Sequence, residues 1–159
     1  MRFALPLSLL LFLVGCDTFG DSVNDIVFDN LAPGTFRMVA DDEDRAGTAR
    51  YYRDRFLTPE DSTTRLEPLL SFETERGDRL SMKDDVLLNA EPGDQLDIDA
   101  GYRTVDGGVF TRRSGVAEVT YSDSTRIEGT FRFRMKDIAI GCLACRTITV
   151  EGGFNATVQ

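Results

Sequence analysis

The sequence predicts an all-β fold, a single antiparallel β-sandwich or barrel-like domain over residues 25–159. Apolar and polar residues alternate with a period of two between Leu96 and Val150, as in strands with one buried face. Turn signals rich in Gly, Pro and Asp separate these short segments. No segment carries a convincing helical stripe, so we expect little helix after residue 16.

The first half of the domain is expected to contain short strands separated by acidic and proline-containing turns. Tyr51 and Tyr52 are adjacent, so we expect one in the core and one outside. Pro68 interrupts an alternating segment, which indicates a sheet edge or a bulge. The expected strands cover residues 34–40, 48–57, 66–72, 80–82 and 86–88, with turns at 41–44 and 58–61.

The second half shows clearer strands. Phe131 and Phe133 lie on one face of an alternating segment, and Arg132 lies on the other. We therefore expect the two phenylalanines in the core and the arginine in solvent. The expected strands cover residues 96–102, 117–121, 127–135 and 148–150, with turns at 91–94 and 106–108.

The N-terminus resembles a lipoprotein export signal. Arg2 precedes an apolar run over residues 3–14, which is shorter than the roughly 20 residues of a spanning helix. The run ends in Leu13-Val14-Gly15-Cys16, which resembles the lipobox of bacterial lipoproteins. The resemblance implies a signal peptide at 1–15, a diacylated N-terminus at Cys16 and a tether over 16–24. The alternative is a buried N-terminal strand ending in a free cysteine.

Composition excludes several classes of chemistry. The leader contains one arginine and no acid, so the remaining chain carries 17 basic and 27 acidic side chains, a net charge of −10. This charge argues against a nucleic-acid partner. The chain contains no histidine, which rules out Ser–His and Cys–His nucleophile pairs and the common zinc sites. We expect no metal and no cofactor.

Cys142 and Cys145 form the remaining cysteine pair, between two predicted strands. In an exported protein such a pair is expected to be oxidised, so we predict a structural disulfide. A loop this short contributes about 2 kcal/mol on the chain-entropy model. Redox-active thiols and metal binding are the alternatives, although no βαβ pattern surrounds the motif.

A family resemblance appears in the last third of the chain. The segments Gly129-Thr130-Phe131-Arg132-Phe133 and Ile148-Thr149-Val150-Glu151-Gly152-Gly153-Phe154 resemble a strand pair found in small Bacteroidota-type lipoproteins of unknown function. The resemblance implies an all-β domain in which Phe131, Phe133, Ile148 and Phe154 face one core. It implies no catalytic residues.

The acidic side chains have two interpretations. The run Asp41-Asp42-Glu43-Asp44 offers oxygen ligands for Ca²⁺, without the spacing of an EF-hand, but a solvated acidic surface is favoured. Asp97 and Asp99 lie on the polar side of a predicted strand, where we expect them to pair with Arg132 or Arg134. Exposed pairs of this kind contribute at most about 1 kcal/mol each.

These observations predict a non-enzymatic lipoprotein of the bacterial cell envelope, anchored to a membrane through Cys16. The outer membrane and the periplasmic face of the inner membrane both remain open. Its β domain is expected to bind a small ligand or an envelope protein partner. The alternatives are a thiol-redox or hydrolytic envelope enzyme, and a lipocalin-like carrier with a wide apolar cavity.

Overall fold

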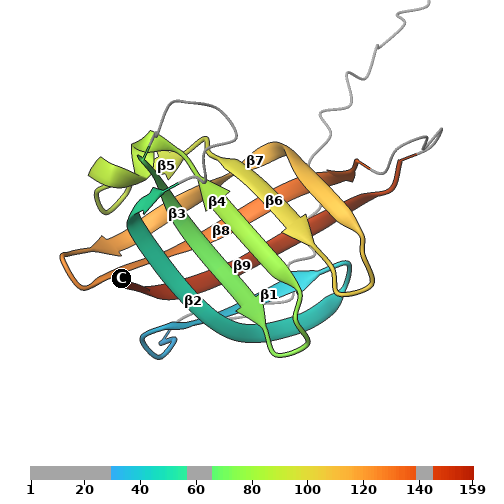
Figure 1. Ribbon diagram of the computed structural model, residues 1–159, viewed down its shortest axis with the longest axis horizontal. Coiled ribbons are helices and arrows are strands. Elements are labelled where there is room, and N and C mark those ends of the chain that lie inside the picture. The colour runs from blue at the N-terminus through green and yellow to red at the C-terminus, as the bar shows by residue number, and fades with distance from the viewer. Residues whose placement is uncertain (1–29, 57–65, 139–144) are drawn as a thin grey trace, which may run out of the picture.

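The computed structural model describes residues 30–56, 66–138 and 145–159, which form a β-barrel (Figure 1). The described residues contain no α-helix, and a 3₁₀ helix, η1, is their one helical element. The elements are β1 Thr35–Ala40, β2 Glu43–Phe56, β3 Leu66–Thr74, β4 Arg79–Lys83, η1 Asp85–Asn89, β5 Gln95–Leu96, β6 Asp99–Arg103, β7 Val109–Ser122, β8 Arg126–Asp137 and β9 Thr147–Val158.

Strand pairing decides between a barrel and a sandwich. The sheet runs in the order β7-β6-β4-β3-β2-β1-β9-β8, and the pairing of β7 with β8 closes it into eight strands. Because β1 is short, its neighbours β2 and β9 also meet directly, in parallel, at Arg50↔Thr157 and Tyr51↔Val158. β5 and β6 both pair with β7, so the single strand predicted at 96–102 is interrupted.

The centre of the barrel is packed with aromatic rings. Phe131, Phe133, Ile148 and Phe154 are at most 5% exposed, which confirms the predicted core face, and Arg132 is exposed. Neighbouring rings lie 5.3 to 6.4 Å apart between centroids, a normal spacing for packed aromatic pairs. The described interior is therefore a solid core, unlike the wide cavity of a lipocalin-like carrier.

Two inward-facing glycines make room for this core. Gly152 lies opposite Phe131, and Gly129 lies opposite Phe154, in the ladder between β8 and β9. A Cβ on Gly152 would lie 2.8 Å from Cζ of Phe131, and one on Gly129 would lie 2.9 Å from Cζ of Phe154. The rings thus cover the bare backbone of the neighbouring strand.

Two predictions for the middle of the chain need correction. Residues 86–88 form part of η1 and not a strand, since the Asp84 carboxylate accepts a hydrogen bond from the Val86 amide at 3.2 Å and caps the turn. Pro68 is not on an edge strand, because β3 pairs with both β2 and β4. It does face a register shift between Tyr52 and Arg55, so the bulge is confirmed.

The turn between β7 and β8 is organised by one carboxylate. Asp123 accepts hydrogen bonds from the backbone amides of Thr125 at 2.7 Å and Arg126 at 2.9 Å. The hydroxyl groups of Tyr121 and Thr125 donate to it at 2.7 and 2.8 Å. These bonds, with the Thr125 amide first, hold the pKa of Asp123 far below its usual range.

Several predictions lie outside the described residues. They include the signal peptide 1–15, Cys16 and the tether 16–24, and also Cys142, so lipidation and the disulfide remain predictions. Cys145 is described and is half-buried. Within the described ranges, no helix is long and apolar enough to cross a membrane.

Candidate functional site

The inward face of the barrel changes from apolar to charged at one end. Every second residue of a strand faces the barrel interior. Asp78 comes two residues before the buried Leu80, and Arg146 comes two residues before the buried Ile148. Arg45 lies on the inward-facing side of β2. These residues surround a pocket of about 460 Å³, which we call the mouth. Its floor is formed by Tyr102, Phe110 and Ile148, so the mouth lies directly on the packed core.

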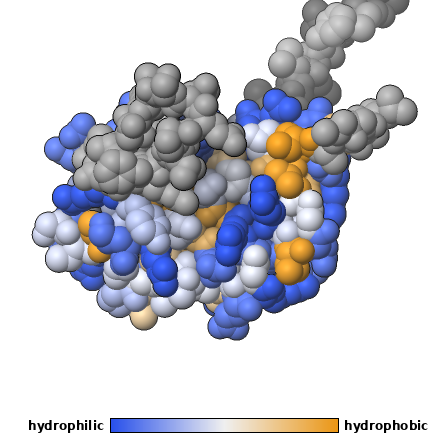
Figure 2. All heavy atoms as spheres, viewed as in Figure 1, coloured by the Kyte–Doolittle hydropathy of each residue, from blue (hydrophilic) through white to orange (hydrophobic). Residues whose placement is uncertain are grey.

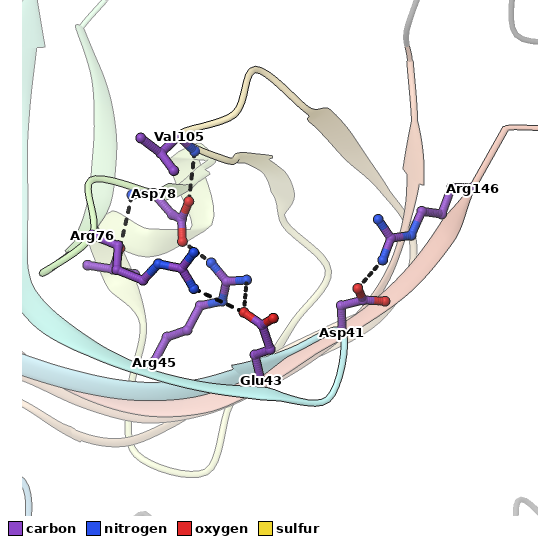
Figure 3. A network of polar contacts seen from close by, with 8 residues as sticks. Asp41, Glu43, Arg45, Arg76, Asp78, Val105 and Arg146 are labelled. Atoms are coloured by element: carbon purple, nitrogen blue, oxygen red, sulfur yellow. Dashed lines mark hydrogen bonds and ion pairs between the residues drawn. The ribbon is translucent and has the colours of Figure 1, made fainter.

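A buried ion pair forms the inner wall of the mouth (Figure 3). The Arg45 guanidinium donates through Nη1 to Oδ2 of Asp78, and the side chains are 11% and 1% exposed. The other oxygen of Asp78 accepts the backbone N–H of Val105 at 2.7 Å. Removing one partner of a buried pair leaves an uncompensated charge, so Arg45 and Asp78 hold the β3–β4 turn against β2.

Two hairpins with the same turn carry this wall. In the β3–β4 turn, Thr74 donates its N–H to the Asp78 carbonyl at 2.9 Å, and its hydroxyl accepts the Asp78 N–H at 2.9 Å. In the β6–β7 turn, Thr104 makes the same two bonds with Gly108, both at 2.9 Å. The fourth residue of each turn, counted from its threonine, is a glycine. Gly77 has a φ of 95° and Gly107 a φ of 92°, in the left-handed region that favours glycine. The bond from Val105 to Asp78 joins the two hairpins.

An outer ring of ion pairs lies nearer the solvent (Figure 3). Glu43 accepts from Nη2 of Arg45 at 3.0 Å and from Nη1 of Arg76 at 3.1 Å. Asp41, in the β1–β2 turn, pairs with Arg146. The predicted acidic run therefore divides among separate arginines, and Asp44 pairs with Arg37 outside the mouth. In the described part of the chain, no three acidic or sulfur side chains group as a metal site.

Two buried polar atoms in the mouth have no partner among the described residues. The hydroxyl oxygen of Tyr102, a residue that is 1% exposed, forms no hydrogen bond, and neither does Nε of Arg45. The Arg45 guanidinium carbon lies 6.0 Å from the centroid of the Tyr102 ring. Burial raises the pKa of Tyr102, Arg45 opposes the shift, and Glu43 adds to it. Leaving such a group unpaired costs about 1–3 kcal/mol, so an acceptor brought within hydrogen-bonding distance of these atoms would recover that cost.

Three of the five acidic side chains that line the mouth are already held by arginines. The carboxylates of Asp41, Glu43 and Asp78 are each held by an arginine, which leaves none of these three as an unengaged base. The raised pKa keeps the Tyr102 phenol protonated, so it acts as a hydrogen-bond donor.

Two apolar side chains are exposed at positions next in sequence to residues that line the mouth. Val105 is 55% exposed and Ile138 is 50% exposed, on the β6–β7 turn and just after β8. Figure 2 shows hydrophobic patches at the right-hand end of the molecule, where these connections lie, beside hydrophilic side chains.

Of two further predictions from the sequence, the ion pairs of Asp97 and Asp99 are wrong and the placement of the two adjacent tyrosines is correct. Asp97 pairs with Arg112 of β7, and Arg132 pairs with Glu151 at 3.1 Å, so the predicted pairs with Arg132 or Arg134 are wrong. The reason is that β5 and β6 pair with β7 and not with β8. Tyr51 is buried and donates to the Leu87 carbonyl at 2.9 Å, whereas the neighbouring Tyr52 is half-buried, as predicted.

Sequence reasoning did not identify Arg45, Asp78 and Tyr102 as a site. Their signal was present, because charged residues occupy inward positions at the ends of several strands, where the alternation predicts apolar ones. Comparison of the chain with protein-family models, curated proteins and solved structures finds no match.

Proposed function

We propose that this protein is a lipoprotein of a bacterial cell envelope whose barrel binds a small polar ligand in the mouth. The anchor is supported by the Leu13-Val14-Gly15-Cys16 motif after a short apolar leader. Two or three acyl chains on Cys16 would hold the protein stably at a membrane, since each buried methylene contributes about 0.8 kcal/mol.

The observation that carries the binding proposal is the unpartnered, buried hydroxyl of Tyr102 in a preformed polar pocket. A volume of about 460 Å³ falls within the range of small-molecule sites, roughly 300–1,000 Å³. The pocket rests on a packed core, and the Asp78 ion pair fixes its wall before any ligand arrives. Preorganisation of this kind lowers the entropic cost of binding.

The thiol-redox form of the enzyme alternative depends on Cys142 and Cys145, and no observation on the described residues favours it. Thiol-redox activity would need an exposed, low-pKa cysteine beside a positive group or a helix N-terminus. We therefore keep ligand binding as the proposed function.

Thermal unfolding of the mature chain, with a library of small polar compounds, tests the proposal. Tyr102→Phe removes only the unpartnered oxygen, so the free variant should be at least as stable as the wild type. Compounds that bind in the mouth should raise the unfolding temperature of the wild type and of a Tyr52→Phe control, but raise that of Tyr102→Phe less. Either the absence of any stabilising compound or equal stabilisation of all three proteins overturns the proposal.

A further inference from the structure

The mouth has unpartnered hydrogen-bond donors at its buried end and an exposed carboxylate at its rim. At the floor and inner wall, the unpartnered atoms are the Tyr102 hydroxyl and the Arg45 Nε–H, and both can donate hydrogen bonds. A ligand that satisfies both must present an acceptor oxygen. A carboxylate is the strongest such acceptor, because hydrogen bonds to an ionised group are roughly twice as strong as neutral ones.

The surroundings disfavour a simple anion. Five acidic and three basic side chains line the pocket, so its lining carries a net charge of −2. The chain beyond the leader is also strongly acidic, with 27 acidic residues against 17 basic ones. A ligand that brought only negative charge would be repelled on approach and in the site.

One carboxylate at the rim remains available. Asp106 is exposed, lines the same pocket and forms no hydrogen bond or ion pair with any described residue. It lies in the β6–β7 turn, next to Val105, whose N–H is bound to Asp78. Its position is therefore tied to the same buried pair that forms the inner wall, and it can receive a cationic group.

We infer that the mouth selects small zwitterions of the amino-acid type, with the ligand carboxylate at Tyr102 and Arg45 and the ligand ammonium at Asp106. This inference rests on the proposed function and names its ligand class. A zwitterion satisfies the donors at the floor, and its positive charge offsets the acidic lining. A pocket of about 460 Å³ accommodates such a molecule.

Calorimetric binding to the mature chain tests the ligand class. The probes are the free α-amino acids and, for the tightest binder, its N-acetyl derivative and its carboxamide. We expect the free amino acid to bind at least about tenfold more tightly than either derivative, because each derivative lacks one charge.

Three variants separate the two ends of the ligand. Asp106→Asn should weaken binding of the free amino acid about twofold to fivefold and leave the N-acetyl derivative unaffected, as for an exposed ion pair. Asp99→Asn, which changes an exposed acid outside the pocket, should have no effect. Tyr102→Phe should weaken every ligand that places its carboxylate at the floor.

The outcomes distinguish this inference from the proposed function. If the N-acetyl derivative binds as tightly as the free amino acid, or uncharged compounds alone bind and respond to Tyr102→Phe, the mouth is a site but the zwitterion inference is wrong. If no amino acid binds and no library compound responds to Tyr102→Phe, both fail.

Discussion

Replacing Gly152 with alanine places a methyl group where the barrel has no space. The new Cβ would lie 2.5 Å from the carbonyl oxygen of Arg37, 2.7 Å from Cβ of Met38 and 2.8 Å from Cζ of Phe131. The first two contacts involve backbone or a Cβ atom, which cannot move aside without shifting β1. The Phe131 ring is itself packed against other rings.

The magnitude follows from these contacts. Overpacking a core by one methyl group typically costs about 1–3 kcal/mol. Alanine recovers about 0.4–1 kcal/mol of that through its smaller unfolded-state entropy. Because all three contacts are below 3.0 Å, we expect a net loss of about 2 kcal/mol in the free energy of unfolding.

Gly101→Ala is the matched control on another barrel strand. Its new Cβ would lie 3.6 Å from Oγ of Ser81 and 3.9 Å from the Phe110 carbonyl oxygen, which are ordinary contacts. This variant should be unchanged or more stable by about 0.5 kcal/mol. Equilibrium urea unfolding of the mature chain, followed by far-UV circular dichroism, measures both variants. Equal midpoints for the two would refute the assignment of Gly152 to a contact with the aromatic core.

Four further predictions concern the ion pair, pH, the anchor and the cysteines. Asp78→Ala leaves a buried guanidinium without its partner and should lower the free energy of unfolding by about 3–5 kcal/mol, measured by urea unfolding. Because the pKa of Asp123 is lower in the folded state, its contribution is present above its unfolded pKa of about 3.9 and is lost as the pH falls towards the folded value. Thermal unfolding between neutral and acid pH should therefore show a shallower loss of stability for Asp123→Ala. Cys16→Ser should abolish lipidation and signal removal, and move the protein out of the detergent phase in a partitioning experiment. Cys142 and Cys145 should resist alkylation without reductant, as read by mass spectrometry, and their double serine variant should lose about 2 kcal/mol.

Each of these predictions has a control and a contradicting result. Asp44→Ala breaks an exposed pair with Arg37 and should cost less than about 1 kcal/mol, so an equal effect at Asp78 would contradict a buried structural pair. An Asp123→Ala variant with the acid limb of the wild type would show that the turn hydrogen bonds do not act through that carboxylate. Maturation and membrane retention of Cys16→Ser would contradict the lipoprotein assignment. Two freely alkylated thiols in protein taken from the envelope would contradict the disulfide.

Period-two alternation was sufficient to predict which side chains of β8 face the core. Phe131 and Phe133 are buried and Arg132 is exposed, because the direction of a side chain in a strand depends only on its parity. The turn at residues 106–108 was equally readable, since it depends on glycine at a local left-handed position. Fold class and hairpin turns are thus properties of short segments.

Pairing between distant strands was decided only in three dimensions. Whether the sheet closes depends on β7 meeting β8 while β1 meets β9, and alternation is the same in a barrel and a sandwich. The same limit explains why Asp97 was assigned the wrong arginine, because a polar face does not identify the neighbouring strand.

The mouth depends on tertiary structure most of all. Arg45 of β2 and Asp78 of the β3–β4 turn are 33 positions apart, and Tyr102 comes from β6. From the sequence, only Tyr102 was placed on the apolar side of an expected strand, whereas Arg45 and Asp78 lay outside the expected strands. Only the closed barrel brings them together beneath one opening, because burial, ion pairing and the lack of a partner for the Tyr102 hydroxyl depend on which strands surround them.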